Sequence, residues 1–546
     1  MKTAEALRVR SSPRERSFDS PSLWSPLRVR NFRNLLIADV VSDIGTFMQS
    51  VGAAWLMVSF GAGPLYVALT QTASSLPFFV LALPAGSMGD IVDRRKLILF
   101  TEAWMVAMAA LLAVLTFSGG MTPWLLLVFT FAISAGDALE TPTWRAILPE
   151  LVGRADLAAA SALNGIEFNL ARAVGPALAG ALIAVAGVGP AFLVNAVSFA
   201  GVIWLVARWR RPSPTRALPA ETLASATVAG LRYVRHSPGI RALSVRSGSV
   251  MFVASAILAL LPSVAQHVSN GSFGYGFLLA CFGSGAIVGG LLVQRARARW
   301  STDAVVSTAV AILGVSVALS GTARTLGGLG ALMVLAGAAW ITFSSLLSAL
   351  VQGMAPDWVR ARVLAVFMLV FQGGLAAGSA LWGLVAERVG VQGALGLAGL
   401  SCIAIGAVSY RWRLPTAPVD VSPWNHWRMP AVIGDVDFVD DGPVLVTVEY
   451  FVDSDQVVPF VHAMHDYERV RRRDGASRWG LYHDTEVPDR YLETFLVTSW
   501  AEHLRQHARL TQADRKIESR IETFIRSQPK VEHLIDAQRD IMARAD

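Results

Sequence analysis

The sequence predicts an all-α polytopic membrane protein with twelve transmembrane helices in two six-helix halves, followed by a small soluble α+β domain. Of its 546 residues, 53% are hydrophobic and only 16% are charged, whereas a soluble protein of this size carries about 25% charged residues. The apolar residues gather in runs of roughly 20, the length that one helix needs to cross a bilayer. After about residue 414 these runs stop, and an alternating pattern typical of strands follows.

Twelve apolar runs are long enough to span a membrane, and a polar break divides them six and six. The runs are 34–60, 65–86, 97–117, 124–146, 157–185 and 190–208, then 243–264, 273–293, 304–321, 327–350, 363–386 and 391–410. The expected units are an N-terminal tail (1–30), the first half (31–209), a central loop (210–240), the second half (241–413), a linker (414–440) and the soluble domain (441–546). The number of residues from Gly86 to Gly289 equals the number from Gly175 to Gly378, as expected if the two halves are parallel repeats.

The basic residues predict which side of the membrane each loop occupies. Alternate loops are rich in arginine, whereas the loops between them hold little beyond Arg324 and Arg388. Because basic loops stay in the cytoplasm, we expect a multi-pass protein of the cytoplasmic membrane, embedded in the lipid bilayer, with both termini cytoplasmic. The net charge of +7 is thus attributed to the basic loops that set the membrane topology, and no nucleic-acid partner is expected. The basic N-terminus lacks the apolar segment of a secretory signal.

A tight basic turn, GSMGDIVDRRK, joins the second and third runs. It resembles the loop between the second and third helices of the major facilitator superfamily, whose pattern is Gly, three residues, Asp, a basic residue, any residue, Gly and two basic residues. The matching positions are Gly86, Asp90, Arg94 and Arg95. Ile91 and Asp93 depart from the pattern. The resemblance implies a conformational-switch loop in a transporter, and the alternative is a plain positive-inside turn.

The fifth run carries a stripe of small residues that favours close helix packing. From Arg172 to Gly180 it resembles the Gly-Pro motif of drug:proton antiporters, with Gly175, Pro176 and Gly180 matching and Ala179 where a Gly is usual. In that family the motif is associated with export, although close packing alone explains the stripe equally well. In the second half, we expect the corresponding close contact at two further glycines, Gly374 and Gly378.

Charged residues inside the runs ask for an explanation, because each costs about 2.5 to 3.5 kcal/mol at the bilayer centre. The candidates for proton coupling are Asp43, Asp137, Asp39, Glu140 and Glu167. Asp43 would lie about 14 Å into its helix, close to the midplane. The superfamily resemblance implies that the first and fourth helices line the central cavity, where a carboxyl can bind and release a proton near neutrality. Arg172 and Asn169 are expected to gate substrate or to partner a charge; a structural ion pair is the alternative.

The soluble domain is expected to alternate strand and helix. We predict strands at 444–451, 478–484 and 491–500 and helices at 456–472 and 501–526, an order typical of a ferredoxin-like unit. The runs Arg473–Ala476 and Ser499–His503 resemble the tail of the transmembrane secretion effector branch, which is related to enterobactin exporters and whose tail looks like an antibiotic-biosynthesis monooxygenase. His503 and His507 lie four apart, but a third metal ligand cannot be placed, so neither a metal site nor a cofactor is expected. Packing, self-association or sensing is favoured over catalysis.

The predicted function is export of a small amphipathic molecule, siderophore- or drug-like, by proton antiport with alternating access. The chain has no P-loop pattern, so direct use of ATP is not expected. A proton gradient is the remaining energy source, and one charge moved through 100 mV yields about 2.3 kcal/mol. Two alternatives stay open: a membrane-tethered, monooxygenase-like enzyme, and a ligand sensor that does not transport.

Overall fold

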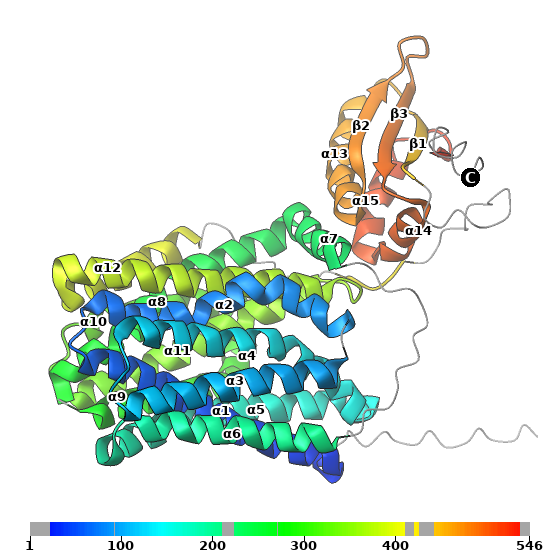
Figure 1. Ribbon diagram of the computed structural model, residues 1–546. Coiled ribbons are helices and arrows are strands. Elements are labelled where there is room, and N and C mark those ends of the chain that lie inside the picture. Colours follow the sequence, from blue (N-terminus) through cyan, green and yellow to red (C-terminus); the bar gives the residue numbers. More distant parts are fainter. Residues whose placement is uncertain are drawn as a thin grey trace, which may run out of the picture.

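The computed structural model describes residues 22–91, 93–209, 223–269, 271–409, 420–424 and 442–535. Long helices lie side by side in one bundle, and a small domain with a sheet stands beside one end of it (Figure 1). Most of the predicted N-terminal tail, much of the central loop and nearly all of the linker lie outside the described residues.

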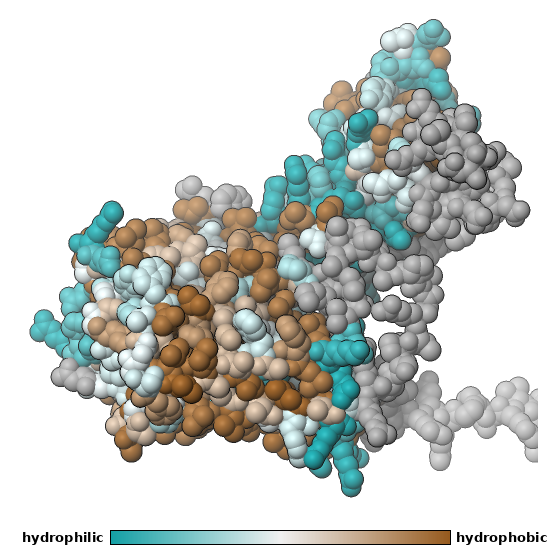
Figure 2. All heavy atoms as spheres, in the orientation of Figure 1, coloured by the Kyte–Doolittle hydropathy of each residue, from teal (hydrophilic) through white to brown (hydrophobic). Residues whose placement is uncertain are grey.

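Six long helices form the first half of the bundle. They are α1 (Arg30–Ser59), α2 (Pro64–Ile91), α3 (Arg94–Phe117), α4 (Pro123–Leu151), α5 (Leu157–Ala186) and α6 (Gly189–Arg208). Local signals set their ends: the Thr122 side chain caps α4, and Gly187, with φ of 80°, ends α5. Apolar side chains form a band across the outer face of the bundle, with hydrophilic residues at both ends (Figure 2). That band matches the hydrocarbon core of a membrane.

The second half begins with a short amphipathic helix from the central loop, α7 (Leu223–His236). The longer helices that follow are α8 (Pro238–Ser269), α9 (Ser272–Arg299), α10 (Thr302–Ser320), α11 (Leu326–Met354) and α12 (Arg360–Ser409). Within the described residues, eleven helices are long and apolar enough to cross a membrane. The chain is therefore a multi-pass membrane protein.

The last of these helices, α12, is interrupted at Gly390. Its 50 residues would measure about 75 Å as one helix, far more than a bilayer core of about 30 Å. At Gly390 the backbone leaves the helical region, with φ of 78° and ψ of 160°. The part before this point packs on α8 and α2, and the part after it packs on α10. The two predicted runs 363–386 and 391–410 thus correspond to two helical segments with different neighbours.

The two halves meet along two helix pairs, α5 with α9 and α2 with α12. Gly180 and Gly276 allow the first pair to approach so closely that a Cβ added at Gly276 would lie 2.5 Å from the Pro176 carbonyl oxygen. In the second pair, the Thr72 hydroxyl donates to the Ala376 carbonyl at 3.0 Å. These contacts lie toward the helix ends farthest from the basic turn at Arg94.

The small domain is a four-stranded antiparallel sheet covered by helices. Its elements are β1 (Val444–Phe451), α13 (Val457–Asp474), β2 (Ser477–His483), β3 (Arg490–Val497), α14 (Trp500–Arg509), α15 (Gln512–Glu522) and β4 (Lys530–Ile535), with strand order β2-β3-β1-β4. The prediction of one helix over 501–526 is wrong, because Leu510 is extended and Thr511 with Asp514 forms a capping box that starts α15. β4 is a strand that the sequence pattern did not predict.

This domain docks on the bundle through α7. Arg232 of α7 forms an ion pair with Glu502 of α14 at 3.1 Å. On the same helix α14, the Arg509 guanidinium lies 4.4 Å from the ring centroid of Trp358, in the connection between α11 and α12. The Trp358 ring in turn contacts Tyr233 of α7 edge to face. The domain therefore contacts both the central loop and the second half.

Candidate functional site

Six carboxyl groups from four helices lie inside the first half and form what we call the acidic cluster. They are Asp39 and Asp43 of α1, Glu102 of α3, Asp137 and Glu140 of α4, and Glu167 of α5. Each interacts electrostatically with at least one other member. Glu102 is not among the predicted candidates, although a glutamate within an apolar run is the same signal that singled out the others.

Asp43 of α1 and Glu167 of α5 lie close enough for a hydrogen bond between their two carboxyls. Two carboxylates can only accept, so such a bond needs a proton on one of them. Glu167 is only 5% exposed, which disfavours two adjacent negative charges. The Arg172 guanidinium is close enough to attract Asp43. This pair can therefore hold one proton between two helices.

A second carboxyl pair, Glu102 and Glu140, links α3 to α4. Both side chains are buried, with 3% and 7% of their surface exposed. The Thr101 hydroxyl donates to Glu140 Oε2 at 2.6 Å. As in the first pair, a hydrogen bond between the two carboxyls would require a shared proton.

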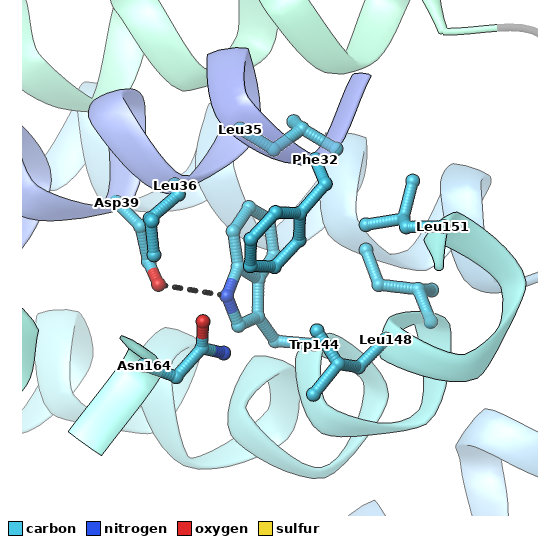
Figure 3. Close-up of a pocket in the computed structure, with 9 residues that line it drawn as sticks. Phe32, Leu35, Leu36, Asp39, Trp144, Leu148, Leu151 and Asn164 are labelled. Carbon is cyan, nitrogen blue, oxygen red and sulfur yellow. Dashed lines mark hydrogen bonds between the residues drawn. The ribbon is translucent and has the colours of Figure 1, made fainter. Parts of the chain in front are cut away.

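Asp39 lies one turn from Asp43 and accepts a hydrogen bond of 2.9 Å from the indole nitrogen of Trp144 on α4 (Figure 3). Figure 3 also shows Asn164 of α5 beside this bond and Phe32 packed on the Trp144 ring. The cavity beside them measures about 10 Å³, close to the smallest space that holds one water. Asp39 thus ties α1 to α4 in a site too small for an organic substrate.

The other predicted site residues surround the cluster. Asp137 accepts from the Thr141 hydroxyl at 3.0 Å and attracts Arg145 on the same helix. The Arg172 guanidinium lies 4.9 Å from the ring centroid of Phe168. Asn169 donates to the Gly165 carbonyl, and its Oδ1 is buried without a hydrogen-bond partner among the described residues. The roles assigned to Arg172 and Asn169 stay predictions.

The predicted switch loop is shorter than expected, because α2 continues to Ile91 and α3 begins at Arg94. The side chains of Gly86 and Asp90 lie outside the described residues. Asp93, where the superfamily pattern has Gly, caps α3 by accepting from the Lys96 amide at 3.1 Å.

Two arginines next to this turn hold the neighbouring helix ends of the first half together. Arg94 donates to Glu150 and to the Ala146 carbonyl on α4, each at 2.8 Å. Arg95 donates to two backbone carbonyls at the end of α6. The turn thus connects three helices of the first half.

The glycines predicted to pack helices lie at helix contacts. A Cβ added at Gly175 would be 3.0 Å from a backbone oxygen of α1, and one at Gly180 would be 3.0 Å from the backbone of α9. A Cβ at Gly374 would be 2.5 Å from a backbone oxygen of α8, which Gly378 also meets. Pro176 lies beside them and turns its carbonyl toward α9.

The second half carries a different arrangement of charges. Arg246 of α8 pairs with Asp303 of α10 at 3.4 Å, and the two residues are 6% and 9% exposed. Neither is a predicted site residue, although Arg246 lies within an apolar run. This pair matches one positive with one negative charge and so needs no proton, in contrast to the carboxyl pairs of the first half.

In the small domain, three histidines come together. His533 of β4 joins His503 and His507 of α14, and one ligand atom from each ring lies within 4.8 Å of the other two. The expectation of no metal site depended on the lack of a third ligand, and His533 is a candidate for that ligand. Burial lowers the pKa of His503 to about 3 and that of His507 to about 4. Burial also lowers the pKa of His533, so all three rings are neutral near pH 7. His507 Nε2 and His503 Nε2 lie at hydrogen-bond distance from each other, 3.1 Å.

Solved membrane transporters share this fold. A mutant of the nucleoside transporter NupG superposes with a TM-score of 0.60 at 11% identity, covering 70% of this chain and 99% of that chain. A bacterial homolog of the lysosomal transporter Spinster, inward-facing and unoccupied, superposes with a TM-score of 0.55 at 15% identity, covering 71% and 96%. The architecture is that of a transporter of the major facilitator superfamily, and the protein is not an enzyme. More narrowly, the chain belongs to the transmembrane secretion effector family, whose model matches residues 21–541.

Several curated relatives are export proteins of bacteria. The multidrug efflux pump Tap of Mycolicibacterium fortuitum is 25% identical over 389 residues, which cover 69% of this chain and 94% of that protein. The enterobactin exporter EntS of Shigella boydii is 26% identical over 269 residues, covering 48% and 62%. The staphyloferrin A transporter of Staphylococcus aureus is 27% identical over 158 residues, covering 29% and 40%. All three relatives are named as transport proteins, and two of the names specify efflux or export.

Proposed function

We propose that this protein exports a small amphipathic molecule in exchange for protons, and that the acidic cluster carries the protons. The observation that supports this most directly is the close approach of the carboxyls in two pairs, Asp43–Glu167 and Glu102–Glu140. A carboxyl pair in a poorly hydrated site binds one proton firmly and loses it when the pair separates or meets a cation. Because each pair joins two helices, a shift of one helix against the other changes proton affinity.

The exchange cycle follows from this coupling. A proton that enters from the outside closes one carboxyl pair, and the pair later opens and releases the proton to the cytoplasm. Arg172 lies near Asp43, so displacement of its guanidinium by substrate would change the charge that Asp43 experiences. A proton that moves inward through 100 mV releases about 2.3 kcal/mol, which supports roughly a 50-fold substrate gradient.

We further infer that the chain crosses the membrane twelve times with both termini in the cytoplasm. The two segments of α12 on either side of Gly390 would cross separately, since each has its own helical neighbours. The contacts between the halves, at Gly180–Gly276 and Thr72–Ala376, lie toward the outer ends of the helices in this orientation. The conformation is then closed to the outside, and reversal of these contacts would open the outer face.

The substrate class is inferred from the relatives, whose names specify multidrug, macrolide and siderophore transport. The small domain is inferred to be ferredoxin-like, because its βαββααβ order differs from the βαββαβ order of that unit only in the division of the second helix, and because its antiparallel strand order β2-β3-β1-β4 matches. Self-association through this domain is a separate proposal. Light scattering can measure the number of chains per particle for the purified protein with and without residues 414–546. The same number of chains in both forms would refute the proposal.

The test of proton coupling is a flux measurement in sealed liposomes with a pH dye inside and either enterobactin or a labelled macrolide as the probe. Asp43→Asn is expected to bind the probe but to release no protons and to build no gradient, and Asp39→Asn should show a weaker defect. Glu387→Gln, a change to an exposed acid of α12 outside the cluster, is the matched control. If Asp43→Asn keeps full proton-coupled flux while Asp137→Asn loses it, the coupling site belongs to α4 and the assignment to Asp43 is wrong.

A further inference from the structure

We propose that the C-terminal domain binds one divalent transition-metal ion of the zinc type through His503, His507 and His533. The three imidazoles belong to two elements that are separate in sequence, α14 and β4. His503 and His507 are one helical turn apart, so both project from the same face of α14. His533 pairs in register with Val446 of β1, whose side chain is buried beneath the helices, so His533 faces α14.

The distances fit a metal site. His503 Nε2 and His507 Nε2 are 3.1 Å apart, and one ligand atom of each of the three rings lies within 4.8 Å of the others. Zinc binds imidazole nitrogen at about 2.0 to 2.1 Å, so two nitrogens of a tetrahedral site are about 3.4 Å apart. The observed separations bracket that value. Small rotations of the rings would bring all three nitrogens to one ion.

The polar surroundings of the three rings are also consistent with a metal site. His503 Nδ1 lies 3.3 Å from Gln506 Oε1, the kind of contact that orients a metal-binding imidazole. His533 Nε2 is buried and has no hydrogen-bond partner among the described residues. A buried imidazole nitrogen without a partner is costly, and a metal ion would satisfy it. The Trp500 ring packs on His503 and His533 at centroid distances of 5.4 and 5.6 Å, which shields the site from water.

The positive charge of the neighbouring Arg471 disfavours binding of a cation at this site. The Arg471 guanidinium acts on both His503 and His507, but Glu493, which is fully buried, pairs with it at 3.1 Å. The same carboxylate accepts from Trp479 and Tyr450, so Arg471 and Glu493 form a neutralised unit beside the site.

The ligand set selects the class of ion. Imidazole nitrogens suit zinc, copper, iron and nickel, whereas calcium and magnesium require oxygen ligands. Three protein ligands leave a fourth tetrahedral position for water or another small ligand. Because α14 also carries Glu502 and Arg509, which contact the bundle, an ion at this site would hold the docking helix against the sheet.

The experiment uses the full-length protein in detergent, purified without a polyhistidine tag and stripped with a chelator. Zn²⁺ is titrated by calorimetry, and Co²⁺ replaces it to give the visible absorption of a tetrahedral nitrogen site. We expect one ion per chain. His533→Gln and His507→Gln should each lower the affinity more than roughly tenfold, since even changes to groups that only orient the ligands cost 10- to 100-fold.

His465→Gln is the matched control, because His465 is exposed on α13 of the same domain, where its ring contacts a backbone carbonyl of its own helix and the edge of Trp479. It should bind as the wild type does. His507 and His533 are only partly buried, so their variants are expected to fold, and circular dichroism checks this. Absence of stoichiometric binding by the wild type, or equal binding by folded His533→Gln, would overturn the proposal.

Discussion

Replacement of Gly276 by alanine should open the outer face of the transporter. Gly276 lies on α9 at the closest approach to α5, where a Cβ would be 2.5 Å from the Pro176 carbonyl oxygen and 2.8 Å from Gly180 Cα. Both neighbours are backbone atoms, so neither can rotate away, and the helices must separate. Insertion of a methyl group into such a packed contact costs about 1 to 3 kcal/mol. If the contact exists only in the outward-closed state, the equilibrium shifts toward the outward-open state by about 5- to 150-fold.

The assay is a distance measurement between spin labels at Ala62 and Arg388, near the outer ends of α2 and α12, in protein whose Cys281 and Cys402 are replaced by alanine. The structure brings these ends together, since a Cβ at Gly63 would lie 3.1 Å from Glu387 Oε1. Gly276→Ala should move the distance distribution to larger values and slow export.

Gly290→Ala is the control for this prediction, because a Cβ at Gly290, on the same helix α9, meets no atom within 4 Å. It should leave both the distances and the export rate unchanged. An unchanged distance distribution in folded Gly276→Ala would show that the α5–α9 contact persists in every state of the cycle, and the proposed gating by this contact would be wrong.

Three further predictions concern topology, switching and docking. Labels at residues 5 and 540 should both react only from the cytoplasmic side; an extracellular signal from either end would break the twelve-crossing arrangement. Asp90→Asn should impair export with little loss of folded protein, because the substitution biases the equilibrium between the inward- and outward-facing states. Export at the wild-type rate would show that the turn only sets the topology of the chain. Docking of the C-terminal domain should weaken in acid. Burial raises the pKa of Glu502, but Arg509 and Arg232 outweigh burial and hold that pKa below its usual value, so the stabilisation is complete above about pH 4.5 and is lost as pH falls through the lowered pKa. Energy transfer between labels on α7 and β2 should report this loss, and Glu502→Gln should abolish the pH dependence; a signal that does not change with pH in the wild type would refute it.

The positions of the membrane helices could be predicted from the sequence because the bilayer makes that problem local. Every backbone polar group in hydrocarbon must be satisfied within its own helix, so an apolar run of sufficient length determines a helix whatever its neighbours are. The interruption of α12 could be placed for the same reason, since Gly390 lies between two such runs. The strand β1 was predicted at its observed bounds because its alternating burial appears directly in the sequence.

The partners of the charged and polar side chains depended on the tertiary structure. A charge inside an apolar run marks Asp43 as a candidate, but its proximity to Glu167 exists only because α1 packs on α5. Glu102 belongs to the acidic cluster for the same reason, because α3 packs on α4 and brings it next to Glu140. His533 lies far along the chain from His507, and antiparallel pairing of β4 with β1 brings it to α14. Periodicity along one element specifies which face a residue occupies; which residue lies opposite it is decided by the packing of elements distant in sequence.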